Sequence, residues 1–429
     1  ALAPMTPLID PRTGLVSGAL DLNTGLPNTN FPTYYNPYIE IAYNDNTNTV
    51  FRNLGTFYGS YKITEGLTFR SEVGYDLLDQ HEERYLTGFS NRNTGAPNGQ
   101  ADDIRSRVFN YTTNNFLSYN KSFDRHDLAL VGGMSFQNST ASFARVQGQQ
   151  FASDSYRKVN AAASITLGNS TETEYSFLSY FLRANYKFAD KYLVSVSGRA
   201  DASSRFGPDN RWGFFPSASA GWILSEESFL ADNSTIEFLK LRVSYGLTGN
   251  AEIGDFPWQG SNSGDAGYAG IPGQRPFQLE NRDLHWEQTA QIDVGVDFGL
   301  FNNRLTGEID YYEKNTSDLL LNVNLPGTAG AARVQTRNLG NLENKGFELV
   351  LNSVNLTGDF KWNTSFNFAR NRNKITDIQD QVIDGNFISQ AKEGEPIAIF
   401  FGPKYAGVDP ANGDALYFMK DANGELTAT

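Results

Sequence analysis

The sequence predicts an all-β fold, an antiparallel up-and-down transmembrane β-barrel in which long strands follow one another along the chain. Three observations lead to this prediction. Apolar and polar residues alternate with a period of two over most of residues 51–371. Most alternating segments reach the length of about 9–11 residues that a tilted strand needs to cross a bilayer. The connections between these segments alternate between short and long, as in a regular meander.

The composition agrees with strands and turns and excludes one class of partner. Charged residues make up 19% of the chain and aromatic residues 13%, with 40 glycines. Aromatic residues favour strands, and glycine favours turns. The net charge of −13 excludes nucleic acid as a partner, because binding to phosphates needs a basic surface. The absence of cysteine fits an oxidising envelope, where an unpaired thiol would form stray disulfides.

The hydropathy of the chain excludes a membrane-spanning helix. No run of about 18 apolar residues is present. The mean hydropathy of −0.44 resembles that of a soluble protein, but a membrane barrel gives a similar average because only every second residue faces lipid. The N-terminus has neither the initial methionine nor the basic and apolar regions of a signal peptide, so we expect a processed chain or a piece of a longer one.

About twelve strands are expected from the alternation. In residues 174–188, Leu182 and Tyr186 fall on an apolar face that we assign to lipid, and Arg183 and Asn185 fall on a polar face that we assign to the lumen. The predicted ranges are 51–63, 67–78, 106–121, 127–138, 174–188, 191–201, 212–224, 238–248, 285–300, 304–316, 344–354 and 359–371.

Every second connection is the longer one, except that the pair 202–211 and 225–237 does not follow this alternation clearly. Outer-membrane barrels have this polarity, with tight periplasmic turns and long extracellular loops, whereas the Greek-key connections of soluble sandwiches mix the lengths. We therefore expect the turn 189–191 and the loop 249–284 at opposite ends of the strands. The other long connections are expected at 79–105, 139–173 and 317–343, with a moderate one at 202–211.

The stretch 195–224 shows the pattern at close range, because two alternating runs flank the polar sequence DASSRFGPDNR. The polar sequence is predicted to turn at the outer rim. Small residues such as Ser195, Ser197, Ser217 and Ser219 share the second face, which suits a lumen holding water or a plug. Pro216 cannot donate a ladder hydrogen bond and predicts a bulge.

No catalytic or metal-binding motif is present, so no catalytic residues, metal or cofactor are predicted. His81, His126 and His285 are widely separated in the sequence and are interpreted as exposed or rim residues. The stretches DPANGD (409–414) and DANGE (421–425) faintly resemble calcium loops. They lack the spacing of an EF-hand, and hairpin turns favour the same residues.

Aromatic residues in the long loops are the candidates for substrate binding, because exposed rings can stack on sugars or peptides. Arg275 supplies a hydrogen-bonding partner, with Asp265 nearby. The alternatives are packing between loops and an aromatic girdle. The candidates are Trp258, Tyr268, Arg275, Phe277 and Tyr156, and Phe89 and Phe151 are further loop aromatics.

Several stretches resemble the SusC/RagA family of TonB-dependent outer-membrane transporters of Bacteroidetes. They are YLVSVSGRADASSRFGPDNRWGFFPSASAGWILSEESF (192–229), LKLRVSYGLTGN (239–250), LENKGFELVLNS (342–353) with FNFARNRNKITDI (366–378), and EGEPIAIFFGPKYAGVDPANGDALYF (393–418). The entire resemblance covers most of the chain. Its first and last stretches are the most specific.

The resemblance implies an import function without catalysis. Members of the family take up oligosaccharides or peptides through a 22-stranded barrel in the bacterial outer membrane. A SusD-like lipoprotein covers the barrel, and the TonB-ExbB-ExbD complex acts on a plug domain. About 12 of the 22 strands are visible here. We expect 1–50 to be a lead-in segment and outer loop, 51–371 the barrel strands and 372–429 an extracellular loop region, with the plug outside this chain.

Two other classes remain open at this point. The first is a secreted or cell-surface β-rich glycan-binding protein, in which the apolar faces would be a buried core. The second is a passive porin or a barrel enzyme. Specificity cannot be read from the loops, because they carry no residue code for the substrate.

Overall fold

A computed structural model describes residues 7–9, 11, 14, 16, 37–88, 99–230, 233–330, 332–379, 381–384, 389–420 and 426–428. Strands dominate, and within these ranges no helix has the length and apolar composition needed to cross a membrane. Contacts divide the chain into two compact units, which we describe separately. Unit 1 comprises Ala1–Ile63, Thr68–Phe116 and Met134–Leu178, and unit 2 comprises Thr64–Leu67, Leu117–Gly133 and Ser179–Thr429.

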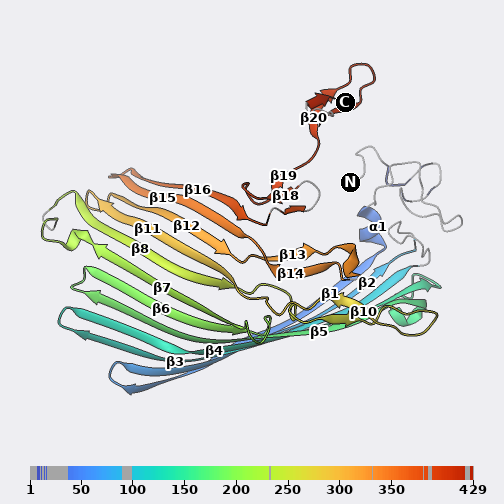
Figure 1. The fold of residues 1–429 in the computed structure, drawn as a ribbon, viewed down its shortest axis with the longest axis horizontal. Coiled ribbons are helices and arrows are strands. Elements are labelled where there is room, and N and C mark those ends of the chain that lie inside the picture. Colours follow the sequence, from blue (N-terminus) through green and yellow to red (C-terminus); the bar gives the residue numbers. More distant parts are fainter. Residues whose placement is uncertain are drawn as a thin grey trace. The chain divides into compact units, whose positions relative to one another are not determined.

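The main sheet has 12 antiparallel strands whose order follows the chain, as the colours of Figure 1 show. Each segment predicted as a strand is a strand of this sheet, so the predicted meander is confirmed. A short helix, α1 (Pro37–Ala42), precedes it. The strands are β1 (Asp45–Thr64), β2 (Leu67–Leu86), β3 (Gln100–Phe123), β4 (His126–Phe151), β5 (Ala162–Phe188), β6 (Tyr192–Ser203), β7 (Trp212–Ile223), β8 (Ile236–Asn250), β11 (Glu287–Leu300), β12 (Leu305–Ser317), β15 (Asn341–Thr357) and β16 (Lys361–Asp377).

Short strands occupy segments outside the main sheet. β9 (Ser261–Ser263) pairs with β10 (Arg275–Gln278) between β8 and β11, and β13 (Leu320–Asn324) pairs with β14 (Val334–Asn338) between β12 and β15. Two three-stranded sheets follow β16. They consist of β17 (Val382–Asp384), β18 (Ser389–Lys392) and β19 (Ile399–Phe400), and of β20 (Lys404–Val408), β21 (Ala415–Lys420) and β22 (Leu426–Ala428).

The structure describes one of the two stretches that resemble calcium loops. Residues 409–414 form the turn between β20 and β21, in which the Gly413 amide donates to the Asp409 carbonyl at 2.8 Å. Gly413 has a φ of +83°, a conformation that glycine adopts without strain. Residues 421–425 lie outside the described residues.

In unit 1 the strands run further than the sequence predicted. The expected connections 79–105 and 139–173 are mostly strand, and the real connections are 87–99 and 152–161. Charged side chains interrupt the apolar alternation in these extensions. Cross-strand pairing satisfies them, because Asp102, which is 2% exposed, accepts hydrogen bonds from Arg145 and Gln147, each at 2.8 Å.

A small core closes the end of unit 1. Tyr85, Ala101 and Phe151 are buried and pack together, with the Tyr85 and Phe151 rings edge to face at a centroid distance of 5.3 Å. The Tyr85 hydroxyl donates to Asp154 at 2.7 Å, as does the Thr87 hydroxyl. Phe151 is therefore a core residue, and its proposed role as an exposed loop aromatic is wrong.

In unit 2 the connection with the tight turn 189–191 and the one with the long loop 249–284 lie at opposite ends of the strands, as predicted. The turn 189–191 and the segment 224–235 join consecutive antiparallel strands at one end, and 204–211 and 251–286 join them at the other. Neighbouring turns at the first end are hydrogen-bonded. The Ala189 amide donates to the Arg125 carbonyl at 2.7 Å, and the Phe301 amide to the Thr235 carbonyl at 2.8 Å.

The bulge predicted at Pro216 is wrong. β6 and β7 pair without a register shift through Gly198 and Pro216. The pairing of β7 with β8 instead begins at the next residue, Ser217. The missing N–H of Pro216 thus falls where β7 leaves its second partner, and no extra residue is needed to accommodate it.

Candidate functional site

The register of unit 2 sorts apolar and polar residues into separate rows. One row across neighbouring strands consists of Val194, Ala220, Val243, Val294, Tyr311 and Phe347. The adjacent row, displaced by one residue, consists of Ser195, Ser219, Ser244 and Asp293. Because successive residues of a strand point to opposite faces, the sheet has one apolar and one polar face in this unit.

The apolar face is exposed. Leu182 is 63% exposed, and Val196, Phe214 and Tyr245 are each more than half exposed. A contiguous apolar surface of this kind marks contact with protein or with lipid. Leu182 and Tyr180 lie on this face, and the hydrogen bond from Arg183 to Asn185 lies on the other face, as predicted for β5.

Two aromatic clusters border the apolar face. Near the tight turns, ring stacking links Phe123, His126, Phe188, Tyr192 and Trp222, with centroid distances of 4.9 to 6.3 Å. Towards the loop end, Tyr180 stacks on Trp212 at 6.0 Å. Trp212 and Trp222 are ten residues apart on β7, which is about 33 Å along the strand at a rise of about 3.3 Å per residue. With a strand tilt of about 45°, their separation along the membrane normal is about 23 Å. The apolar band of outer-membrane barrels is about 25 Å tall between its aromatic girdles.

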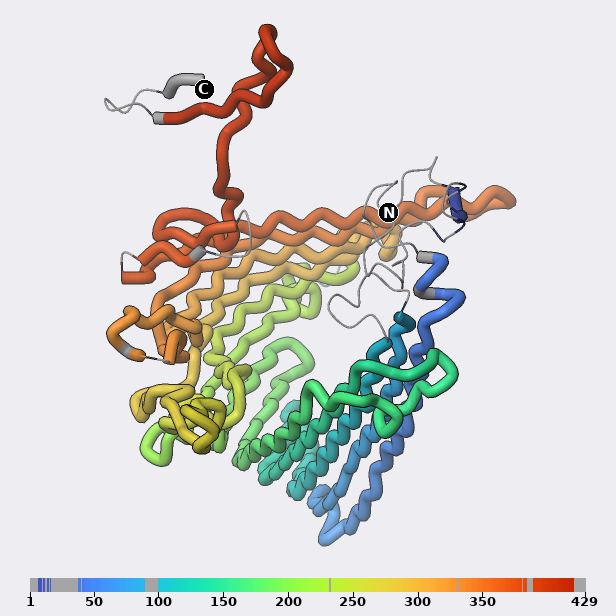
Figure 2. Tube along the Cα trace, turned by 90° about the vertical axis from the view of Figure 1, so that its right-hand side faces the viewer, coloured from blue at the N-terminus to red at the C-terminus, as the bar shows by residue number. Residues whose placement is uncertain are grey.

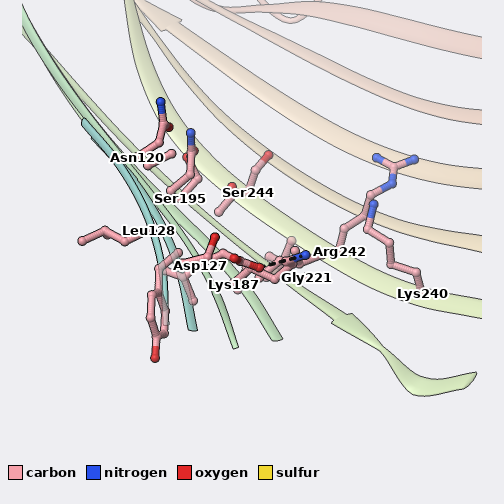
Figure 3. Close-up of a pocket in the computed structure, with 18 of the residues that line it drawn as sticks. Asn120, Asp127, Leu128, Lys187, Ser195, Gly221, Lys240, Arg242 and Ser244 are labelled. Atoms are coloured by element: carbon pink, nitrogen blue, oxygen red, sulfur yellow. Dashed lines mark hydrogen bonds and ion pairs between the residues drawn. The ribbon is translucent and has the colours of Figure 1, made fainter. Parts of the chain in front are cut away.

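The polar face holds an open hollow of about 480 Å³, shown in Figure 3. Ser195 and Ser244 line it with Asn185, and the Ser195 hydroxyl donates to the Asn185 side chain at 2.7 Å. The pair Lys187 and Asp127, joined at 3.0 Å, closes the side toward the tight turns. A second hollow of about 700 Å³ lies further along the same face, lined by Ser197, Ser217, Ser219, Arg183 and Arg199 among others.

Arg242 on the polar face is surrounded by three aspartates. It lies in register with Gly295 on β11, which is in register with Asp310 on β12. The guanidinium donates across Gly295 to Asp310 at 2.7 Å and to Asp297 at 2.8 Å, and lies 3.4 Å from Asp293. Gly295 permits this crossing, because a Cβ there would overlap the Asp310 carboxylate and the Arg242 guanidinium.

At the loop end of unit 2, side-chain hydrogen bonds join three connections, 204–211, 251–286 and 318–340, the last two drawn in yellow and orange in Figure 2. The Trp286 indole donates to the Arg211 carbonyl at 2.8 Å, and the Asn281 side chain donates to the Thr336 carbonyl at 2.8 Å. Beneath them, Phe206 is fully buried and packs on Trp286 with ring centroids 5.2 Å apart. The polar sequence DASSRFGPDNR thus turns at the loop end, as predicted, and forms part of a packed base.

The β9–β10 hairpin projects from this base. The Gln278 side chain donates to the carbonyls of Phe256, Pro257 and Gln259 at 3.1, 3.0 and 2.6 Å and fixes the root of the hairpin. Arg275 binds Asp265 through two hydrogen bonds of 2.8 and 2.7 Å, which lower the pKa of the Asp265 carboxyl below its usual range.

The predicted substrate-binding residues have different surroundings. Tyr268 and Phe277 are 85% and 61% exposed and lie on the same hairpin as Arg275. Trp258 is half-buried, and its indole donates to the Ser204 carbonyl at 3.3 Å, which makes it part of the packed base. Tyr156 is 61% exposed but belongs to unit 1, and Phe89 lies outside the described residues. Ile271, 69% exposed and bridged to Tyr268, is a further exposed apolar residue of this hairpin, which a criterion of aromatic or hydrogen-bonding side chains does not select.

Comparison with known proteins gives consistent matches. The family model for the TonB dependent receptor-like β-barrel matches residues 8–409. TonB-dependent receptor P3 of Formosa agariphila is 35% identical over 404 residues, covering 86% of this chain and 40% of that protein. TonB-dependent receptor SusC of Bacteroides thetaiotaomicron is 33% identical over 346 residues, covering 78% of this chain and 33% of that protein. The chain therefore spans about two fifths or less of the length of these relatives.

The fold comparison agrees. A solved structure of the RagAB peptide transporter superposes with a TM-score of 0.84 and 25% sequence identity, covering 97% of this chain and 46% of that one. These matches confirm the resemblance to SusC and RagA, and they decide against a secreted glycan-binding protein. By sequence and by fold, the chain belongs to the TonB-dependent receptor β-barrel family, and its location is the bacterial outer membrane.

Proposed function

We propose that the chain forms wall and outer loops of an energised importer that takes up an oligosaccharide or a peptide across the outer membrane. The observation that carries the proposal is the match to the RagAB peptide transporter over 97% of the chain. The relationship to SusC supports it. In this protein the apolar face contacts lipid and the polar face lines the substrate path.

The proposed partners follow from the same relationships. They are a SusD-like lipoprotein at the loop end and the TonB-ExbB-ExbD complex, which would act through a plug. We further propose that the protein is not an enzyme, because the polar face offers hydroxyl, amide and paired charged groups suited to reversible contacts. The hollows lined by Ser195, Ser217 and Ser219 support passage of a polar substrate.

The hairpin is the proposed contact with substrate or lipoprotein. Its exposed tip carries Tyr268 and Ile271, while its root is fixed by Gln278. Rigid exposed aromatic side chains bind at a low cost in conformational entropy.

The test removes the tip of the β9–β10 hairpin and keeps the packed base from which the hairpin extends. In the intact protein, residues 264–274 are replaced by Asn-Gly, because Ser263 and Arg275 are register partners that a two-residue turn can join. Uptake of labelled oligosaccharides and peptides is expected to fall at least tenfold, while the barrel still shows heat-modifiable migration on gels. Phe301→Ala is the control, since Phe301 is 53% exposed at the opposite end. Unchanged uptake of every substrate by the shortened protein would contradict the role of the hairpin.

A further inference from the structure

Three metal-ligand side chains meet in unit 1. His81 and Glu83 on β2 and Asp103 on β3 each offer one ligand atom, and these atoms all lie within 4.8 Å of one another. The closest pair is His81 Nε2 and Asp103 Oδ1, at 3.2 Å. His81 and Glu83 are two residues apart on one strand and therefore share a face. Two ligands from one strand and one from another can bind one ion without a dedicated loop.

We propose that His81, Glu83 and Asp103 form a binding site for a divalent transition-metal cation such as Zn²⁺. One imidazole and two carboxylates are a ligand set that Zn²⁺ accepts, and three protein ligands leave a position for water. Ca²⁺ and Mg²⁺ prefer oxygen ligands, so the imidazole favours transition metals over them. The side chains are about one-third exposed, with 31% for His81 and 37% for Asp103, which leaves a path for the ion.

The charges around the site indicate how a cation would enter it. Lys158 forms an ion pair with Glu83, and Arg105 lies 3.6 Å from Asp103. Both basic side chains are about 70% exposed, so each can move into water when a metal arrives. The metal therefore exchanges with Lys158 for the Glu83 carboxylate. Removal of the lysine should strengthen metal binding, whereas removal of a ligand should weaken it.

Metal binding at this place would tie β2 to β3 close to the core of Tyr85, Ala101 and Phe151. A ligand that binds the folded state alone raises the stability of that state with its concentration. The site is independent of the proposed import function, because it uses none of the hairpin or polar-face residues of unit 2.

The test is a calorimetric titration of the intact, detergent-purified protein with Zn²⁺ after removal of metals by a chelator. We expect saturable binding at one site, at least tenfold weaker in His81→Ala and in Asp103→Asn. Lys158→Gln should bind at least threefold more tightly, a gain that misfolding cannot produce. Asp79→Asn is the matched control, because Asp79 lies two residues before His81 on β2 and is not a ligand.

The titrations give different results depending on whether the metal site exists. Unchanged affinity in Asp79→Asn together with the loss in His81→Ala and the gain in Lys158→Gln supports the site. Absence of saturable Zn²⁺ binding, or equal binding by wild type and His81→Ala, overturns it. Heat-modifiable migration of each variant on gels verifies that it is folded. Import measured without Zn²⁺ tests the proposed function separately, since loss of this site leaves the hairpin intact.

Discussion

The two faces of unit 2 share the same strands but use different physical means of stabilisation. The apolar face carries long exposed side chains such as Leu182 and Val196, whose stabilisation depends on the medium that covers them. The polar face holds its charges in internal pairs, with Arg242 bound to Asp297 and Asp310. One face therefore depends on the lipid environment, and the other is satisfied by partners within the sheet and by water.

The two faces should therefore tolerate charged substitutions to different degrees. A charge placed on the apolar face must enter the hydrocarbon layer, where no partner is available. A charge placed on the polar face stays in water or finds one of several polar neighbours. The apolar face should reject charge in a way that depends on depth, and the polar face should reject changes that break its paired side chains.

The largest effect is expected from a charge on the lipid side. Leu182 lies on the apolar face with Tyr180 and Tyr186, so Leu182→Arg should cost about 2–4 kcal/mol of folding free energy, as for arginine near the bilayer midplane. Asn185→Arg on the polar face loses the hydrogen bonds from Ser195 and Arg183, but water replaces them, so the cost should stay near the net value of one hydrogen bond, about 1 kcal/mol. Urea titration of folding into lipid vesicles measures both, and equal costs for the two variants would show that the faces do not differ.

The next effect concerns the crossing of Arg242 over Gly295. Gly295→Ala places a Cβ about where the guanidinium and the Asp310 carboxylate lie, with Arg242 Cζ at 2.5 Å. These atoms are the ends of flexible side chains that must move apart, so we expect a loss of about 1 kcal/mol, as for a weakened hydrogen-bonded pair. Gly198→Ala is the control, because its nearest neighbour on the apolar face is Phe214 at 3.4 Å. A loss in Gly198→Ala that equals or exceeds the loss in Gly295→Ala would disprove the packing role.

The smallest effect is a pH dependence at the tight-turn end. Glu227 accepts hydrogen bonds from the Tyr192 hydroxyl at 2.6 Å and the Trp222 indole at 3.1 Å, and these bonds lower the pKa of its carboxyl from 4.5. A lowered pKa in the folded state stabilises the protein above the unfolded pKa and loses that effect as the pH falls through the folded value. The melting temperature of wild type should exceed that of Glu227→Gln by a constant margin above pH 5, and the margin should shrink below pH 4.5. A margin that is the same at pH 3 as at pH 6 would mean that the charge of Glu227 is not what stabilises this end.

The pattern of the strands could be predicted from the sequence, because alternation, turn residues and connection lengths are local properties. The twelve segments and the opposite ends of 189–191 and 249–284 follow from them. The extensions of β3 and β4 could not be found in this way, since charged residues such as Asp102 and Arg145 satisfy each other across the two strands. The role of Trp258 was also hidden, because its partner Ser204 lies 54 residues away in the sequence.

Side-chain clusters were the least predictable feature. Asp103 lies 22 residues from His81 in the sequence, and their contact depends on the register of two strands. The same holds for Arg242 and Asp310, which meet across a third strand at Gly295. Exposed residues that need no partner, such as Tyr268 and Phe277, were easier to identify, since a loop position is sufficient to predict exposure.

The most direct test of the two-faced wall is a pair of nitroxide labels in the intact protein in lipid bilayers. A label at position 182 should collide rapidly with oxygen, which concentrates in the hydrocarbon layer, and little with a water-soluble nickel chelate. A label at position 185 should show the reverse order, because Asn185 lines the hollow of the polar face. Shielding of the label at 182 from both reagents would mean that this face packs inside protein, and would contradict the assignment of the apolar face to lipid.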